Sequence, residues 1–247
     1  MSAFFLASVV FCGAFFAALA GMLLRVALPG AHLDADSRDV IKLVLGLIGT
    51  MSALILGLLI ASANSNYNEQ SSELQSISAK IILLDRILTY YGPESEGARK
   101  QLGEAVAAAH DRIWSPQGLR PTNLEAANRF MQQLQALSPK TDMARQLQGR
   151  ALQIAENILQ TRLLMASQAG GAIPAPFLAI LVFWICVLFL GFGMFTRFNG
   201  TVAAALFVGA FSVAGAIFLI LELNTPYQGF MQISDAPLRA VLSQIGR

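Results

Sequence analysis

The residues that could carry out chemistry are few and scattered along the chain. The sequence holds two histidines and two cysteines. Cys12 and Cys186 both lie inside apolar runs and are interpreted as small buried residues. His32 precedes Asp34 and Asp36, but no second histidine is nearby, so this stretch is more typical of a solvated loop than of a metal site. No nucleophile with a neighbouring base and no glycine-rich phosphate loop can be nominated. The sequence therefore predicts no enzyme, no metal and no cofactor.

A candidate interfacial polar site lies toward the end of the chain. Glu222, Asn224 and Asp235 carry the carboxylate and amide oxygens that a hard cation prefers. The two carboxylates are well separated in the sequence, and helix capping or anchoring at the membrane interface explains them equally well. Both interpretations are retained.

A third set of residues is small and recurs every three or four positions between Lys42 and Asn66. Its members share one narrow face of a predicted helix: Gly46, Thr50, Ala53, Gly57, Ala61 and Asn64. Small side chains allow two helices to pack closely. Alternatively, such a face lines a pathway, where hydroxyl groups and backbone carbonyls tolerate water or ions. The six are candidate pore-lining or helix-packing residues, and both roles coexist if packing assembles a ring of helices.

Composition indicates that most of these residues are positioned by helices in a membrane. Of 247 residues, 55% are hydrophobic and only 13% are charged, whereas soluble domains have roughly 25% charged residues. Four apolar runs reach the ~20 residues needed to cross a bilayer: 3–24, 41–63, 175–195 and 202–221. Their interiors lack ionisable residues, which argues against an ion-coupled transporter. A net charge of +2 without a basic cluster predicts no nucleic-acid partner.

The sequence therefore predicts an all-α fold with four transmembrane helices and an extramembrane helical bundle inserted between the second and third of them. The predicted domains are a transmembrane hairpin (1–63), the bundle (64–171), a second transmembrane hairpin (172–222) and a C-terminal amphipathic tail (223–247). Four crossings place the bundle and both termini on the same side of the membrane. Basic residues near the two faces are almost equal in number and do not orient the chain.

A regular apolar seam follows the second membrane run. It comprises Leu74, Ile77, Ile81, Leu84, Leu88 and Tyr91, separated by alternating steps of three and four residues. This is the spacing of helices that pack along a seam. Because no proline interrupts the chain, one helix is predicted from Ile41 to Tyr91. Further helices are predicted at about 94–114, with His110 on its polar surface, at 123–137, and from Ser138-Pro139 onward. Ser234 is predicted to cap a short helix that either lies on the membrane or covers the bundle.

Three stretches of this sequence resemble a bacterial membrane family called bestrophin-like. They are "HLDADSRDVIKLVLGLIGTMSALILGLLIASANSNYNEQSSELQ", "IILLDRILTYYGPE" and "LELNTPYQGFMQISDAPL". Bestrophins are pentameric anion channels with four membrane helices per subunit, whose second and third crossings extend into a cytosolic helical domain. The resemblance implies a similar architecture, a location in the bacterial inner membrane, and a cytoplasmic side for the bundle and both termini.

Two departures from bestrophins limit what the resemblance implies. The second membrane run has no aromatic residue between Lys42 and Asn66, whereas the bestrophin pore has an aromatic constriction. The chain also lacks a dense acidic run like that of the bestrophin calcium site. Anion selectivity and calcium gating are therefore not carried over to this chain.

Two functions are compatible with these observations. The first is an oligomeric pore or ion channel with bestrophin-like architecture. The alternative is a non-conducting membrane scaffold or signal relay that binds a protein partner through its helical domain. Under either hypothesis we expect the chain to contact membrane lipid and to form a homo-oligomer.

Overall fold

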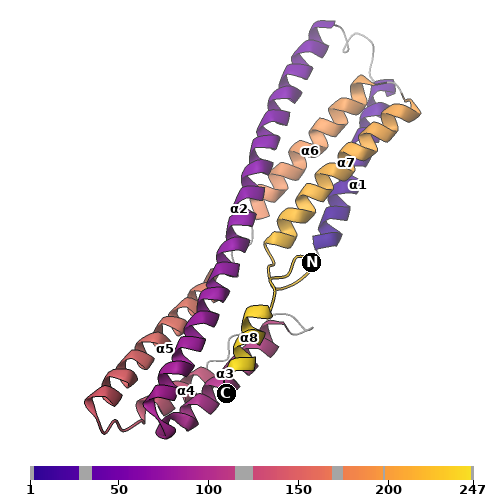
Figure 1. Ribbon diagram of the computed structural model, residues 1–247. Coiled ribbons are helices and arrows are strands. Elements are labelled where there is room, and N and C mark those ends of the chain that lie inside the picture. Colours follow the sequence, from indigo (N-terminus) through magenta and orange to yellow (C-terminus); the bar gives the residue numbers. More distant parts are fainter. Residues whose placement is uncertain (1–2, 28–34, 115–124, 169–174, 197, 246–247) are drawn as a thin grey trace. The chain divides into compact units, whose positions relative to one another are not determined.

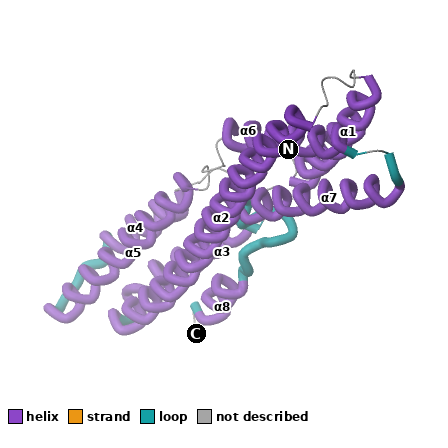
Figure 2. The backbone as a smooth tube through the Cα atoms, turned by 90° about the horizontal axis from the view of Figure 1, so that it is seen from above, coloured by secondary structure: helices purple, strands orange, loops and turns teal. Residues whose placement is uncertain are grey.

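The computed structural model describes residues 3–27, 35–114, 125–168, 175–196 and 198–245, and all regular elements within them are helical (Figure 2). The helices are α1 (Ala3–Ala27), α2 (Ala35–Tyr91), α3 (Glu96–Ile113), α4 (Glu125–Gln135), α5 (Asp142–Gln168), α6 (Ala175–Phe195), α7 (Gly200–Leu223) and α8 (Ala236–Gln244), with a 3₁₀ turn, η2 (Pro93–Ser95), before α3. Four of them, α1, α2, α6 and α7, are long and apolar enough to cross a membrane. This confirms the predicted all-α fold with four helices that could span a membrane.

The chain divides into two compact units. Residues 1–66 and 172–224 form one unit, which we call the membrane unit. Residues 67–171 and 225–247 form the other, which we call the bundle unit. Helix α2 contributes its first part to the membrane unit and its last part to the bundle unit.

Helix α2 is a single unbroken helix of 57 residues (Figure 1). The predicted continuous helix from Ile41 to Tyr91 is therefore confirmed. Gly92 follows with a φ of 113°, a conformation that glycine adopts without the steric cost of a Cβ. Pro93 then opens the 3₁₀ turn η2, a position that suits its fixed φ.

Close contact between α1 and α6 is the main packing feature of the membrane unit. A Cβ added at Gly21 would lie 2.0 Å from the carbonyl oxygen of Leu190, and one added at Gly193 would lie 2.0 Å from that of Ala18. Ala18 itself is fully buried. Backbones can approach this closely only where side chains are absent or very small. Two glycines thus fix how these two membrane helices meet.

The core of the bundle unit forms around the predicted seam of α2. Leu74, Ile77, Ile81, Leu84 and Leu88 are all 5% exposed or less, as the three-and-four spacing predicts. They cluster with apolar residues of the other bundle helices: Leu102 and Val106 of α3, Phe130 and Leu134 of α4, Ala151 and Ala155 of α5, and Leu238 and Val241 of α8. Burial of these faces away from water supplies the main stabilisation of the bundle.

The structure refines two predictions, which concern the start of α5 and the position of α8. Helix α5 begins at Asp142 rather than at Ser138-Pro139, because the Thr141 hydroxyl accepts a hydrogen bond from the Ala144 backbone N–H at 3.1 Å and so caps the first turn. Helix α8 packs on the bundle core through Leu238 and Val241. Of the two placements predicted for the C-terminal helix, the structure has the one that covers the bundle.

Candidate functional site

The membrane half of α2 presents its small residues outward. All six residues of the predicted face, Gly46, Thr50, Ala53, Gly57, Ala61 and Asn64, are exposed. Apart from the backbone of α2 itself, nothing lies within 4 Å of a Cβ added at Gly46 or Gly57. The residues of this segment that are buried are Leu45, Ser52 and Ala63. Within the described residues, the chain therefore leaves the small-residue face of α2 uncovered.

Glycines in the membrane unit are thus used in two different ways. Gly21 and Gly193 lie where two helices of the same chain touch, and a side chain at either position would overlap a backbone carbonyl. A Cβ added at Gly46 or Gly57 would meet no other helix of the described chain within 4 Å. The α2 face is therefore available to another molecule, either as a packing surface or as part of a pathway.

The surroundings of this face are strongly apolar. Leu43, Leu54 and Leu58 are each at least 68% exposed on the same segment of α2, and lipid tails can cover such side chains without cost. The Thr50 hydroxyl donates a hydrogen bond to the Leu47 carbonyl oxygen at 2.8 Å, so its donor is satisfied within the helix. The face is therefore a narrow strip of small and weakly polar groups bordered by large apolar ones.

The three residues of the candidate interfacial polar site belong to different units. Glu222 is buried near the end of α7, and Asn224 follows that helix, with its backbone N–H bonded to the Ile220 carbonyl at 3.2 Å. Asp235 lies in the bundle unit. Among the described residues, no group of three or more histidine, cysteine, aspartate and glutamate side chains could hold a metal ion.

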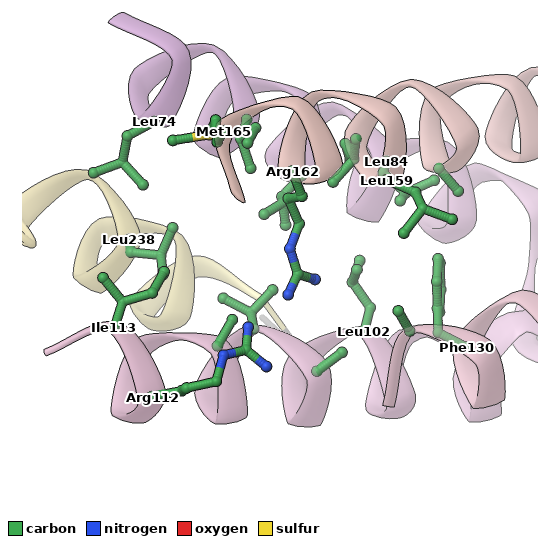
Figure 3. Close-up of a pocket in the computed structure, with 18 of the residues that line it drawn as sticks. Leu74, Leu84, Leu102, Arg112, Ile113, Phe130, Leu159, Arg162, Met165 and Leu238 are labelled. Atoms are coloured by element: carbon green, nitrogen blue, oxygen red, sulfur yellow. The ribbon is translucent and has the colours of Figure 1, made fainter. Parts of the chain in front are cut away.

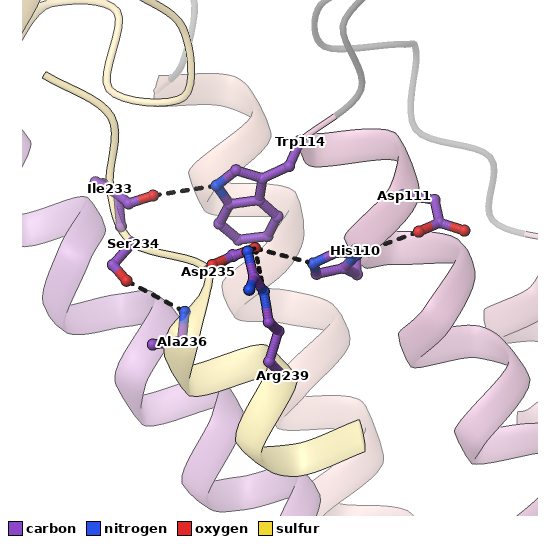
Figure 4. A network of polar contacts seen from close by, with 8 residues as sticks. All are labelled: His110, Asp111, Trp114, Ile233, Ser234, Asp235, Ala236 and Arg239. Carbon is purple, nitrogen blue, oxygen red and sulfur yellow. Dashed lines mark hydrogen bonds and ion pairs between the residues drawn. The ribbon is translucent and has the colours of Figure 1, made fainter. Parts of the chain in front are cut away.

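Asp235 anchors the C-terminal segment to α3 (Figure 4). Its carboxylate accepts a hydrogen bond from Nε of Arg239 at 2.6 Å and lies 3.3 Å from Nε2 of His110. Beside it, Trp114 donates from Nε1 to the Ile233 carbonyl at 3.1 Å. The indole also stacks on the His110 ring, with centroids 5.4 Å apart. These contacts hold residues 233–239 against the end of α3.

The protonation of Asp235 reflects these partners. Burial acts to raise the pKa of its carboxyl group, but hydrogen bonds from Arg239 and His110, together with their charges, outweigh it and lower the pKa below the usual value. Asp235 is therefore ionised at neutral pH and has basic partners, which identifies it as an anchor for the C-terminal segment.

Helical periodicity predicts that His110 lies on the polar side of its helix, but the structure leaves that surface only partly exposed at this position. Its side chain is only 22% exposed, because the segment before α8 folds over it. Periodicity within α3 carries no information about a segment more than a hundred residues away. The sequence does contain one indication that this surface is covered. Trp114 lies one turn after His110, directly after the end of α3, and large aromatic side chains are usually at least partly buried.

A comparison with protein families matches residues 12–238 to the bestrophin-like domain. A search of the curated proteins gives no significant match, and a search of the solved structures gives none either. The matched range includes all of α2 to α7 and the segment that contains Asp235. Four of its helices have the length and composition of membrane spans, so the chain is a multi-pass membrane protein. It belongs to the bestrophin-like family.

Proposed function

We propose that this protein is an oligomeric, pore-forming membrane protein in which α2 helices from several copies surround a pathway for ions. The observation that carries this proposal is the uncovered small-residue face of α2, on which Gly46 and Gly57 have no neighbour from their own chain. Membership of the bestrophin-like family supports it. The proposed function requires no catalytic step and no cofactor.

The physical argument concerns what can cover this face. Lipid tails pack well against the large side chains that border it, such as Leu54 and Leu58. They pack less well into a narrow strip of glycine and alanine, whereas another helix fits there closely and gains van der Waals contact along its length. Asn64 continues the strip at the end of the apolar run. Contact with another helix and a hydrated pathway are the two ways in which the strip can be covered.

A second candidate function is a non-conducting relay or scaffold that binds a protein partner. The observation that favours it is the continuity of α2 over 57 residues. A rigid helix passes a small displacement from one end to the other, as in known helix-shift mechanisms. Under this alternative, the exposed face of α2 would serve assembly alone.

Ion flux separates the two candidates. The full chain, purified and reconstituted in liposomes, should dissipate a potassium gradient, a chloride gradient or both at measurable rates if α2 lines a pore. The same protein should run as an oligomer in native mass spectrometry from detergent. An oligomer with no flux of either ion, across a range of pH and calcium concentrations, would reject the pore and favour the scaffold.

Replacement of Gly57 by leucine tests the role of the α2 face directly. A Cβ added at Gly57 has nothing within 4 Å among the described residues, so the monomer should fold, but a leucine side chain should force apart any helix packed on this face. We expect weaker assembly, by at least about 1.4 kcal/mol or a tenfold change in the association constant, together with reduced flux.

The matched control is Gly215→Leu on α7, where an added Cβ also meets nothing within 4 Å. That variant should assemble and conduct like the wild type. If Gly57→Leu and Gly215→Leu have the same mass and the same flux as the wild type, the α2 face is not an interface.

A further inference from the structure

The bundle unit contains an apolar cavity that the proposed pore does not use (Figure 3). Its volume is about 150 Å³. Helices α2, α3, α4, α5 and α8 all contribute to its wall, with side chains such as Leu74, Leu102, Phe130, Ile158 and Leu238. A cavity of about 150 Å³ lined by similar residues holds benzene. This cavity therefore has room for one aromatic ring or a short acyl chain.

Two arginine side chains enter this apolar cavity from different helices. Figure 3 shows Arg112 of α3 and Arg162 of α5 with their guanidinium groups pointing toward one another. Two like charges that face each other in apolar surroundings repel, and their desolvation adds a further cost. An anion placed between them would be attracted by both guanidinium groups and would offset their mutual repulsion.

The pKa shifts of the two arginines agree with this geometry. Burial lowers the pKa of the Arg112 guanidinium. Burial also lowers the pKa of Arg162, and the neighbouring charge of Arg112 lowers it further. In the part of the chain that the structure describes, the Arg162 guanidinium has no hydrogen bond or ion pair. Arg162 is thus a partly desolvated cation that experiences the like charge of Arg112.

The arginines lie where the apolar cavity adjoins a second, more polar hollow. This hollow has a volume of about 380 Å³ and shares Arg112 and Arg162 with the cavity. Asp111, Glu125 and Arg129 also line it. Both acidic side chains are exposed, and Asp111 lies 3.2 Å from His110. The site therefore has an apolar end, a pair of cations in the middle and an opening to polar surroundings.

We propose that this cavity binds a small anionic amphiphile, with an oxyanion head between Arg112 and Arg162 and an apolar body in the cavity beyond them. The planar guanidinium group matches carboxylate and phosphate oxygens in paired hydrogen bonds. A carboxylic acid and a phosphate monoester share the required chemistry. The proposal concerns only the bundle unit, so it does not depend on whether α2 lines a pore.

Binding can be measured by calorimetry on the full chain in nanodiscs of zwitterionic lipid, with empty nanodiscs as the blank. The probes are hexanoate and hexyl phosphate, and their relative affinities identify the preferred head group. Hexanol supplies the apolar body alone, and acetate and inorganic phosphate supply the head alone. We expect hexanoate or hexyl phosphate to bind at least tenfold more tightly than hexanol and than its own head group. If neither binds, or if hexanol or the head group alone binds as well, the proposal is wrong.

Two variants assign the binding to this cavity. Arg162→Gln should weaken binding of the better probe at least tenfold, whereas Arg150→Gln, an exposed arginine on the same helix, should not change it. Ala155→Leu keeps both arginines but fills the apolar space, and it should weaken binding to a similar extent. Unchanged binding in either Arg162→Gln or Ala155→Leu would overturn the assignment.

A stability measurement distinguishes a binding arginine from a structural one. Without ligand, Arg162→Gln should raise the melting temperature, because it removes one of two repelling charges from an apolar cavity. A lower melting temperature together with unchanged probe affinity would give Arg162 a structural role only.

Discussion

Asp235 receives a hydrogen bond from Arg239 on its own helix and lies within reach of His110 on α3. Its side chain is 17% exposed, so water screens these contacts only in part. Because the folded state lowers the pKa of Asp235 below the usual 3.8, the resulting stabilisation is complete above that pH. It is lost as the pH falls through the lower, folded-state pKa.

Acidification should therefore release the C-terminal segment from α3. In a Trp184→Phe background Trp114 is the remaining tryptophan of the two, and its fluorescence reports the contact with Ile233. We expect the signal to be constant from neutral pH down to about 4 and to change below it, following the pKa shift. Asp235→Asn should show the released signal already at neutral pH. Asp142→Asn, whose carboxylate is 92% exposed, is the control and should behave like the parent protein.

Prediction from the sequence was weakest for the contacts of single residues. Arg112 and Arg162 belong to no motif and are fifty positions apart, so nothing in the sequence indicates that their guanidinium groups converge. Arginines on amphipathic helices are ordinarily solvated. Their convergence depends on how α3 and α5 pack around α2, which no local sequence pattern determines.

Among the secondary-structure elements, α2 was the most predictable. The alternating spacing of leucine and isoleucine between Leu74 and Leu88 requires one apolar helix face, and those residues are buried as expected. The start of α5 was less predictable, because a proline at 139 and a threonine at 141 are both common at helix starts. The small-residue face of α2 could be located from its spacing, but spacing alone does not say whether its own chain covers it.

A charge placed in the seam tests how much α2 supports the bundle. Leu88 is 1% exposed and lies outside the arginine-lined cavity, so an aspartate there would be buried in the apolar core of the bundle. Leu88→Asp should destabilise the bundle by about 3–5 kcal/mol, the usual cost of an uncompensated buried charge. Thermal unfolding of the purified protein measures the effect. Leu83→Asp, at a position on the same helix that is 43% exposed, should unfold close to the wild-type temperature.

At the scale of the whole molecule, the number of membrane crossings determines the topology of the chain. We expect α1, α2, α6 and α7 each to cross the membrane, which would put the bundle residues and the C-terminal helix on one side. The short connection between α6 and α7 is then on the other side. This arrangement follows from the even number of crossings between the bundle and the C-terminal helix, and it holds for either proposed function.

Cysteine labelling from outside sealed vesicles tests this topology. In a background with Cys12 and Cys186 replaced by alanine, Lys140→Cys and Ser243→Cys should react with a membrane-impermeant maleimide from the same side. Phe198→Cys, at a position that is 76% exposed, should react only from the opposite side. Labelling of all three positions from one side would show that one of the four apolar helices does not cross.

The hydrogen bond from Thr50 to the Leu47 carbonyl has a consequence for the kind of ion that a ring of α2 helices would admit. With the hydroxyl hydrogen directed back into the helix, each Thr50 offers a passing ion only its oxygen lone pairs, which attract cations and repel chloride. Turning the hydroxyl outward toward an anion would sacrifice a hydrogen bond, at about 1 kcal/mol for each subunit. At this level of the membrane, the permeation preference would therefore be opposite to that of the anion-conducting bestrophins, with potassium favoured over chloride.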